Sequence, residues 1–172
     1  MDFQQTVRGA MGGFEQLVSR IPGYSGYKEK ETRREADKLL REYLATQLDA
    51  ERRRLADIQR QMLDGGGLTL LDDVERAVTK VQKLADMIRT ATYGYAGLFD
   101  AVKVKEGQLD ALYQFDNQML DMVDSVRAAV DALGAAQDSG GDVAAAIKNV
   151  IAASEEANAR WRDREHAITG AV

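Results

Sequence analysis

The sequence predicts an all-α protein, an antiparallel bundle of four long amphipathic helices with an additional short N-terminal amphipathic helix. Two observations lead to this prediction. Apolar residues recur every three or four positions along most of the 172 residues, which is the spacing of one helix face. The strongest chain breakers, Pro22-Gly23 and Gly65-Gly66-Gly67, fall between these periodic stretches. Several long helices that each carry an apolar stripe must cover those stripes against one another.

The first periodic stretch covers residues 2–20. Its three glycines each weaken a helix by up to about 1 kcal/mol relative to alanine, so we expect this helix to need a surface to lie on. Pro22 and the glycines that follow predict a hinge. Residues 1–26 are therefore interpreted as a helix and hinge and residues 27–172 as the helical bundle, in a single domain. The apolar face of the first helix comprises Phe3, Val7, Met11, Phe14 and Val18.

Four further helices follow the hinge. The second helix is expected over about 27–63, a length of roughly 54 Å at 1.5 Å per residue, and should extend beyond its partners by roughly 10 to 20 Å. Thr69 is a candidate N-cap for the third helix, and the fourth is expected over about 106–135. Asp142 is a candidate N-cap for the last helix. Arginines in its last turns suit the negative end of a helix: Arg160, Arg162 and Arg164.

Asp116 interrupts the apolar stripe of the fourth helix. A buried carboxylate is costly unless it is paired, so this residue predicts a basic partner on a neighbouring helix. One interpretation is a buried polar contact that sets the register of the helices or acts as a switch. The other is a small rotation of the helix that leaves the acid half exposed. The candidate partners are Arg33, Arg34, Lys83 and Arg89.

An aromatic cluster follows the third helix. Glycines lie among its rings and would let a partner approach closely, so the cluster predicts a partner-binding surface. The alternative is a plug that caps the end of the core. Tyr24 and Tyr27 of the hinge are expected at the same end of the bundle. The cluster comprises Tyr93, Tyr95, Leu98 and Phe99.

Catalytic and metal-binding residues are scarce in the sequence. The absence of cysteine excludes disulfides and thiolate metal sites. Asp163 and His166 have the spacing of a metal-binding pair in a helical bundle, but His166 is the only histidine, and a two-metal site needs two. There is no phosphate-binding loop or nucleophile elbow. We therefore expect no enzymatic activity, no cofactor and no metal.

The charge pattern bears on partners and location. A net charge of −5 and a pI near 5 argue against a nucleic-acid partner. No apolar stretch reaches the roughly 20 residues that span a bilayer, and the N-terminus does not resemble a signal peptide, so we expect a cytoplasmic protein. The charges of residues 2–20 cancel, which disfavours a membrane surface as its docking place. Docking onto the bundle or onto another subunit is the expectation.

The layout of a short amphipathic leader, a proline hinge and long charged helices resembles the phage shock protein A type of membrane-associated coiled coil. The resemblance is one of arrangement, so no site residues are transferred. It implies the alternative function, a peripheral membrane-associated, stress-type coiled coil that uses residues 2–21 as an amphipathic foot. The leading hypothesis is a noncatalytic helical scaffold or interaction protein that presents helix faces to protein partners and self-associates.

Overall fold

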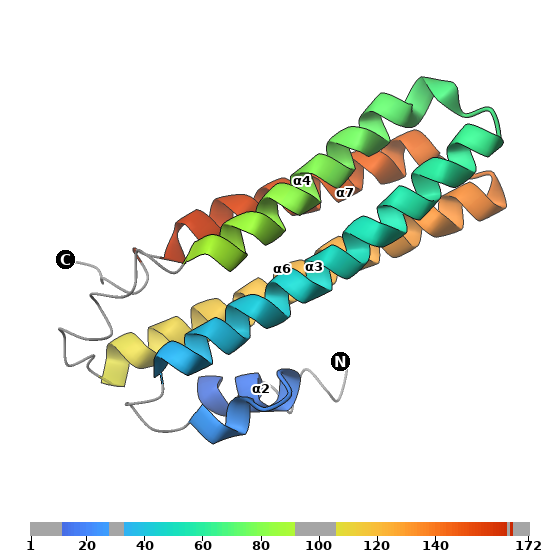
Figure 1. Cartoon of the computed structure of the whole chain (residues 1–172). Coiled ribbons are helices and arrows are strands. Elements are labelled where there is room, and N and C mark those ends of the chain that lie inside the picture. Colours follow the sequence, from blue (N-terminus) through green and yellow to red (C-terminus); the bar gives the residue numbers. More distant parts are fainter. Residues whose placement is uncertain (1–11, 28–32, 92–105, 165, 167–172) are drawn as a thin grey trace.

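The computed structural model describes residues 12–27, 33–91, 106–164 and 166. The predicted all-α bundle is confirmed: these residues form helices and turns, and none of them lies in a strand (Figure 1). Five α-helices and two short 3₁₀ helices make up the described chain. They are α2 (Gly13–Arg20), η1 (Tyr24–Tyr27), α3 (Arg33–Asp64), η3 (Leu68–Leu70), α4 (Leu71–Thr90), α6 (Glu106–Ser139) and α7 (Val143–Arg162).

Four helices surround one core. α3 packs against α4 and α6, and α7 completes the ring by packing against the same two helices. The turn between α3 and α4 and the turn between α6 and α7 lie at the same end of the molecule (Figure 1). The short helix α2 lies outside the ring against α6, and η1 packs against α3. None of the described helices combines the length and the apolar character that a transmembrane span requires.

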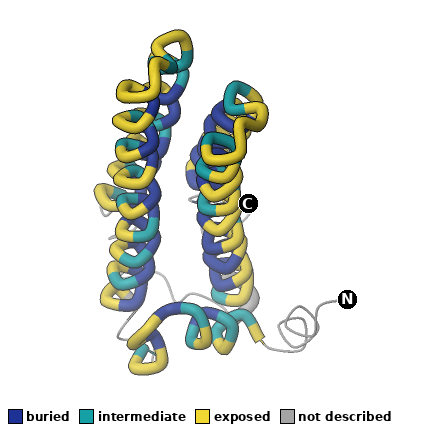
Figure 2. Tube along the Cα trace, turned by 90° about the vertical axis from the view of Figure 1, so that its right-hand side faces the viewer, coloured by how far each residue is buried: buried dark blue, intermediate teal, exposed yellow. Residues whose placement is uncertain are grey.

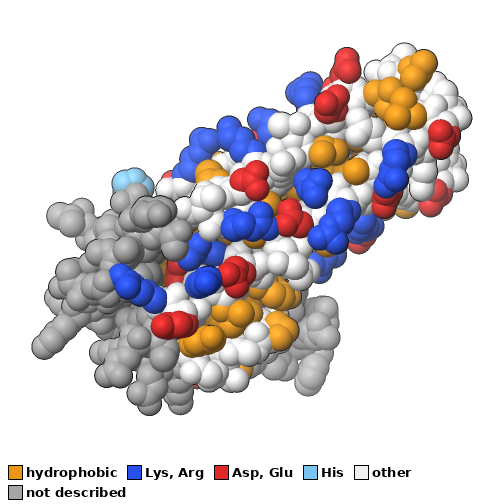
Figure 3. All heavy atoms as spheres, in the orientation of Figure 1, with side chains coloured by type: hydrophobic (Ala, Val, Ile, Leu, Met, Phe, Trp, Pro, Cys, Tyr) orange, Lys and Arg blue, Asp and Glu red, His pale blue; other side chains and the backbone are white. Residues whose placement is uncertain are grey.

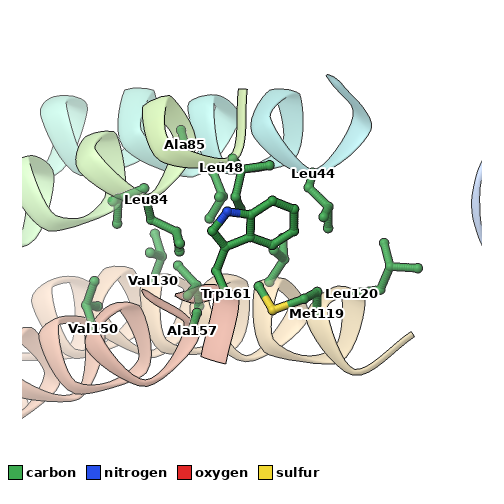
Figure 4. Packing of buried hydrophobic residues seen from close by; sticks show 14 of the residues in the cluster. Leu44, Leu48, Leu84, Ala85, Met119, Leu120, Val130, Val150, Ala157 and Trp161 are labelled. Atoms are coloured by element: carbon green, nitrogen blue, oxygen red, sulfur yellow. The ribbon is translucent and has the colours of Figure 1, made fainter. Parts of the chain in front are cut away.

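The core follows from the helical spacing of the apolar residues. On α4, the residues at intervals of three and four are buried, from Val74 to Ile88, and Figure 2 shows the buried faces of the helices turned toward one another. Trp161 reaches from α7 into the space between the helices, beside Leu48 and Met119 (Figure 4). Each fully buried large apolar side chain contributes about 1.5–3 kcal/mol, so burial of these stripes is the main force that favours assembly of the ring.

Of the two N-cap predictions, one is confirmed and one is wrong. Asp142 is the N-cap of α7, and its carboxylate accepts a hydrogen bond from the Ala145 backbone N–H at 3.0 Å, as predicted. The Thr69 prediction is wrong. α4 begins at Leu71, its N-cap Leu70 makes no side-chain capping bond, and Thr69 lies within η3. The chain enters α4 through this 3₁₀ turn, so the turn takes the place of a side-chain cap.

The expected overhang of the second helix is confirmed against α4 and α7, since α3 has 32 residues and each of these has 20, a difference of about 18 Å. It is wrong against α6. α3 spans 32 residues, but its neighbour α6 spans 34, so the two longest helices match each other. α4 and α7 match as well, at 20 residues each. Tyr27, the expected start of this helix, lies in η1, and α3 is described from Arg33 onward. Both α2 and η1 pack against the long pair, so the long pair supports the N-terminal part of the chain.

Candidate functional site

Asp116 is buried in the bundle, with 2% of its surface exposed. Its carboxylate accepts two hydrogen bonds from Arg164, from Nε at 3.0 Å and from Nη2 at 3.2 Å. This side-on geometry is the strongest arrangement of an arginine and a carboxylate. Arg164 itself is fully buried. The half-exposed interpretation of Asp116 is therefore wrong, and the partner shown, Arg164, is not among the four basic residues that were predicted.

Two further charged residues extend the pair into a network. Arg164 Nη2 lies 2.6 Å from Oδ1 of Asp37, and Arg41 Nε donates to Oδ2 of Asp37 at 2.8 Å. Arg41 Nη1 also donates to the Arg89 backbone carbonyl at 3.0 Å. We call Asp37, Arg41, Asp116 and Arg164 the buried ion network. The two positive and two negative charges of the network balance. The network joins α3, the end of α4, α6 and Arg164, which is the second residue after α7.

Aromatic rings help to fix the arginines around this network. The guanidinium carbon of Arg164 lies 4.8 Å from the centre of the Trp161 ring, and that of Arg160 lies 4.7 Å from the centre of the Phe115 ring. A guanidinium within about 6 Å of a ring centre is attracted by the negative face of the ring. Arg160 Nη2 also donates to Oε1 of Gln118 at 2.6 Å. The end of α7 is thus held to α6 at several points.

Burial changes the acid–base properties of the network. Loss of hydration raises the pKa of Asp116 to about 6; the nearby Arg164 opposes this rise and the Asp37 carboxylate adds to it. At neutral pH the Asp116 carboxylate is therefore ionised and pairs with Arg164. Burial also raises the pKa of the Tyr24 phenol well above its ordinary value, and Asp116 contributes to that rise. The phenol stays protonated.

The N-terminal helix docks on α6 immediately beside Asp116. The side-chain amide of Asn117 donates to the Gly13 backbone carbonyl at 2.9 Å. The backbone carbonyl of Asn117 accepts from Arg20 Nη1 at 3.1 Å. Arg20 Nη2 also lies 2.9 Å from Asp121 and 3.2 Å from Asp124. Polar contacts therefore hold both ends of α2 on α6.

The apolar face of α2 lies on the bundle. Leu17 and Ile21 are buried, and Phe14 and Val18 are partly buried against the core. The remaining members of the predicted amphipathic face, Phe3, Val7 and Met11, lie outside the described residues. As a membrane foot, α2 would have to detach and expose the leucine and isoleucine that it now buries.

Gly13 lies where α2 and α6 are in close contact. A Cβ atom on Gly13 would lie 2.8 Å from the Cβ of Tyr113, closer than such atoms pack. The same approach brings the Phe14 ring to 5.5 Å from that of Tyr113 and to 5.6 Å from that of Tyr24. Glycine at this position therefore allows the aromatic contacts to form.

One short stretch of α6, residues 113–117, thus contacts both distant parts of the chain. We call it the α6 junction. Tyr113 and Asn117 hold α2, and Asp116 holds Arg164. A cavity of about 20 Å³, room for about one water molecule, lies between the tyrosines of η1 and the network. The α6 junction therefore holds α2 and the residues after α7 on the same part of α6.

Two grooves in the surface flank α2. One, of about 550 Å³, runs between the start of α2 and α6 and is lined mainly by amides and carboxylates. The other, of about 220 Å³, lies between the end of α2, α3 and α6 and includes Arg20, Tyr43 and Arg127. On the face formed by α3 and α4, positively and negatively charged side chains alternate (Figure 3). The polar lining of the grooves suits hydrogen bonding to a peptide segment.

The other predicted site residues are not part of the α6 junction or the buried ion network as described. Tyr93, Tyr95, Leu98 and Phe99 lie outside the described residues, so their role stays a prediction. His166 is exposed. Within the described part of the chain, no group of three or more histidines and acids is placed to hold a metal ion.

Sequence reasoning missed most of the buried ion network. Arg164 was interpreted as a cation at a helix end, whereas it lies two residues past α7 and turns into the core. Asp37 and Arg41 carried a usable signal, because they lie four residues apart beside the buried Ala36 and Leu40 on the apolar side of α3. Comparisons of the chain with protein-family models, with curated proteins and with solved structures give no match.

Proposed function

We propose that the protein is a noncatalytic helical scaffold that self-associates and presents helix faces to protein partners. The observation that carries this proposal is the α6 junction together with the buried ion network. The charges buried there pair with one another, Asp116 and Asp37 with Arg164, and Asp37 with Arg41. Such pairs fix the relative positions of helices more than they add stability. The chemistry of this region therefore serves the assembly of chain segments.

The surface beside the junction supports a protein partner. α2 is an added helix rather than part of the ring, and a polar groove lies on each side of it. Amide and carboxylate groups in the larger groove, such as Gln114, Gln118 and Asp110, can bond to the backbone and to basic side chains of a peptide. A coiled-coil-like mode of association, a cytoplasmic location and the absence of cofactor and nucleic acid belong to the same proposal.

Light scattering coupled to size-exclusion chromatography tests the self-association. We expect the mass to rise above the 18.9 kDa of one chain as the protein concentration is raised. A mass that stays at one chain over the whole concentration range would contradict the proposal. The alternative, a membrane foot, predicts that vesicles of anionic lipid carry the protein in flotation and that Leu17→Asp abolishes this. We expect no flotation.

A further inference from the structure

We propose that the buried ion network is a latch that a single proton opens. In the closed state, the ionised Asp116 holds Arg164 in the core. When Asp116 takes up a proton from solvent, Arg164 leaves the core and the contact between α6 and the end of α7 at Asp116 is lost. This goes beyond the scaffold function, because it gives the protein a conformational state that depends on pH.

The geometry of the pair leaves no room for the proton. Oδ1 of Asp116 accepts from Nε of Arg164, and Oδ2 accepts from Nη2. A guanidinium carries donors alone, so a hydrogen placed on either oxygen meets an N–H that already points at it. Protonation also leaves Arg41 and Arg164 with the single carboxylate of Asp37. A buried cation without its partner is costly, which favours the departure of Arg164.

The proton binds to Asp116 rather than to Asp37 because the two acids face different numbers of cations. Asp37 contacts two arginines, Arg41 and Arg164. Asp116 pairs with Arg164 alone among the described residues. An acid with fewer cationic neighbours holds a proton more readily. In agreement, loss of hydration raises the pKa of Asp116 to about 6.

Every element packed around Asp116 contributes to its surroundings. Phenols titrate near pH 10 in water, and burial raises the pKa of Tyr24 further. Arg20 of α2 and Arg160 of α7 contact other side chains of α6, and α4 supplies the Arg89 backbone carbonyl to Arg41. Asp116 is therefore the member of this cluster that changes its charge in the mildly acidic range. The charged and titratable groups around it are Asp37 and Arg41 from α3, Tyr24 and Tyr27 from η1, Tyr113 from α6, and Arg164.

Arg164 has a short path out of the core. It follows Asp163, the C-cap of α7, and His166, two positions further on, is exposed. A rotation of the backbone at Asp163 carries the guanidinium to the surface while the hydrogen bonds of α7 are kept. The cavity of about 20 Å³ adjoins both Asp116 and Arg164, so one water molecule can take the place of the guanidinium beside the neutral carboxyl.

Trp161 is a built-in reporter of the latch. It is the only tryptophan of the chain, it is buried, and the guanidinium carbon of Arg164 lies 4.8 Å from the centre of its ring. The experiment records the Trp161 emission spectrum and its quenching by acrylamide while the full-length chain is titrated from pH 7.5 to pH 4.5. We expect the spectrum to shift and the quenching constant to rise in a one-proton transition with a midpoint near pH 6.

Four variants identify the groups responsible. Asp116→Asn cannot ionise, and Arg164→Gln has no cation to release, so both should show the acid-state quenching at pH 7.5 and no transition. Arg162→Gln, at an exposed arginine two positions before Arg164, is the matched control and should keep the transition. His166→Gln should keep it as well; this variant is needed because an exposed histidine titrates in the same range.

Circular dichroism separates the latch from unfolding. The helical signal should stay constant through the transition, because the apolar core of the ring does not titrate. A helical signal that falls with the same midpoint would overturn the proposal, as would an unchanged Trp161 spectrum between pH 7 and pH 5. Loss of the transition in His166→Gln, or its persistence in a folded Asp116→Asn, would overturn it too. If Asp116→Asn does not fold, the wild type and His166→Gln decide the question by themselves.

Discussion

The two ends of the bundle are built by different means. At the turn end, the chain reverses at Gly66 and Gly140, which have positive φ angles of 80° and 70°. Two leucines are left exposed there, Leu63 at 50% and Leu68 at 64%. At the junction end, a fully buried arginine pairs with two carboxylates, and tyrosines from two elements surround them.

The difference lies in how far apart the contacting residues are in the sequence. The turn end is closed by neighbours, as in the bond from the Gly67 N–H to the Met62 carbonyl. The junction end joins residues such as Gly13 and Asn117, which are 104 positions apart. Local closure tolerates change, whereas a buried charge depends on every one of its partners. The two ends should therefore respond very differently to substitution.

The largest effect is expected for Arg164→Ala. Its removal leaves Asp116 buried without a partner and Asp37 with Arg41 alone, which should lower the free energy of unfolding by about 3–5 kcal/mol. Urea denaturation measures this change. Arg60→Ala, which removes an exposed pair with Asp57, serves as the control and should change stability by less than about 0.5 kcal/mol. Equal effects of the two substitutions would refute a structural role of the buried ion network.

The next effect is a dependence of stability on pH that originates at the junction. The pKa of Asp116 is raised from 3.8 to about 6 in the folded state, so the folded chain binds this proton more tightly than the unfolded chain. The resulting stabilisation is complete below about pH 3.8 and is lost as the pH rises through 6. Two pKa units correspond to at most about 3 kcal/mol.

The comparison of the wild type with Asp116→Asn isolates this contribution, because asparagine does not titrate. The difference in unfolding free energy, wild type minus variant, should fall between pH 4 and pH 7. A difference that rises over this range would mean that Arg164 lowers the pKa of Asp116 more than burial raises it.

At the turn end, Asp142→Ala tests the best local contact. The substitution removes the bond from Asp142 to the Ala145 N–H and should cost about 1 kcal/mol, typical of an N-cap. Thermal unfolding followed by circular dichroism measures it. Asp142→Asn should retain most of the stability, because asparagine also caps helices. If the asparagine variant is as unstable as the alanine variant, capping is not the cause.

The smallest effect is expected for Leu68→Ser, at the most exposed large apolar residue described. The side chain is 64% exposed and gives up little burial, so stability should change by no more than about 0.5 kcal/mol. Urea denaturation again measures the change in the free energy of unfolding. A loss comparable to that of Arg164→Ala would show that the turn end is covered by a second chain in solution.

The sequence predicted the features that depend on local pattern. Apolar spacing identified the helices, and the glycines at 65–67 and 140–141 marked the turns correctly, as did Asp142 at the start of α7. These succeed because each signal lies within a few residues of its effect. The position of Asp116 in an apolar stripe left two interpretations open, burial and half exposure, and only the structure decides for burial.

The partner of Asp116 could not be predicted in the same way. Arg164 lies 48 positions away and beyond the end of a helix, where periodicity no longer indicates which way a side chain points. Its neighbours Arg160 and Arg162 have the same residue type and lie at or near the surface, so composition does not distinguish them. The length of α6 was underestimated for a related reason: the alanines and Gly134 near its end weaken the apolar pattern while the helix continues to Ser139.

The location of Arg164 bears on where this domain ends. A chain shortened after Arg162 would retain every residue of the five α-helices. It would nevertheless remove the arginine that pairs with Asp116 and leave Asp37 with Arg41 alone. Truncation or fusion at the final turn of α7 would therefore remove a side chain that fills and neutralises the interior, although every helical residue is kept.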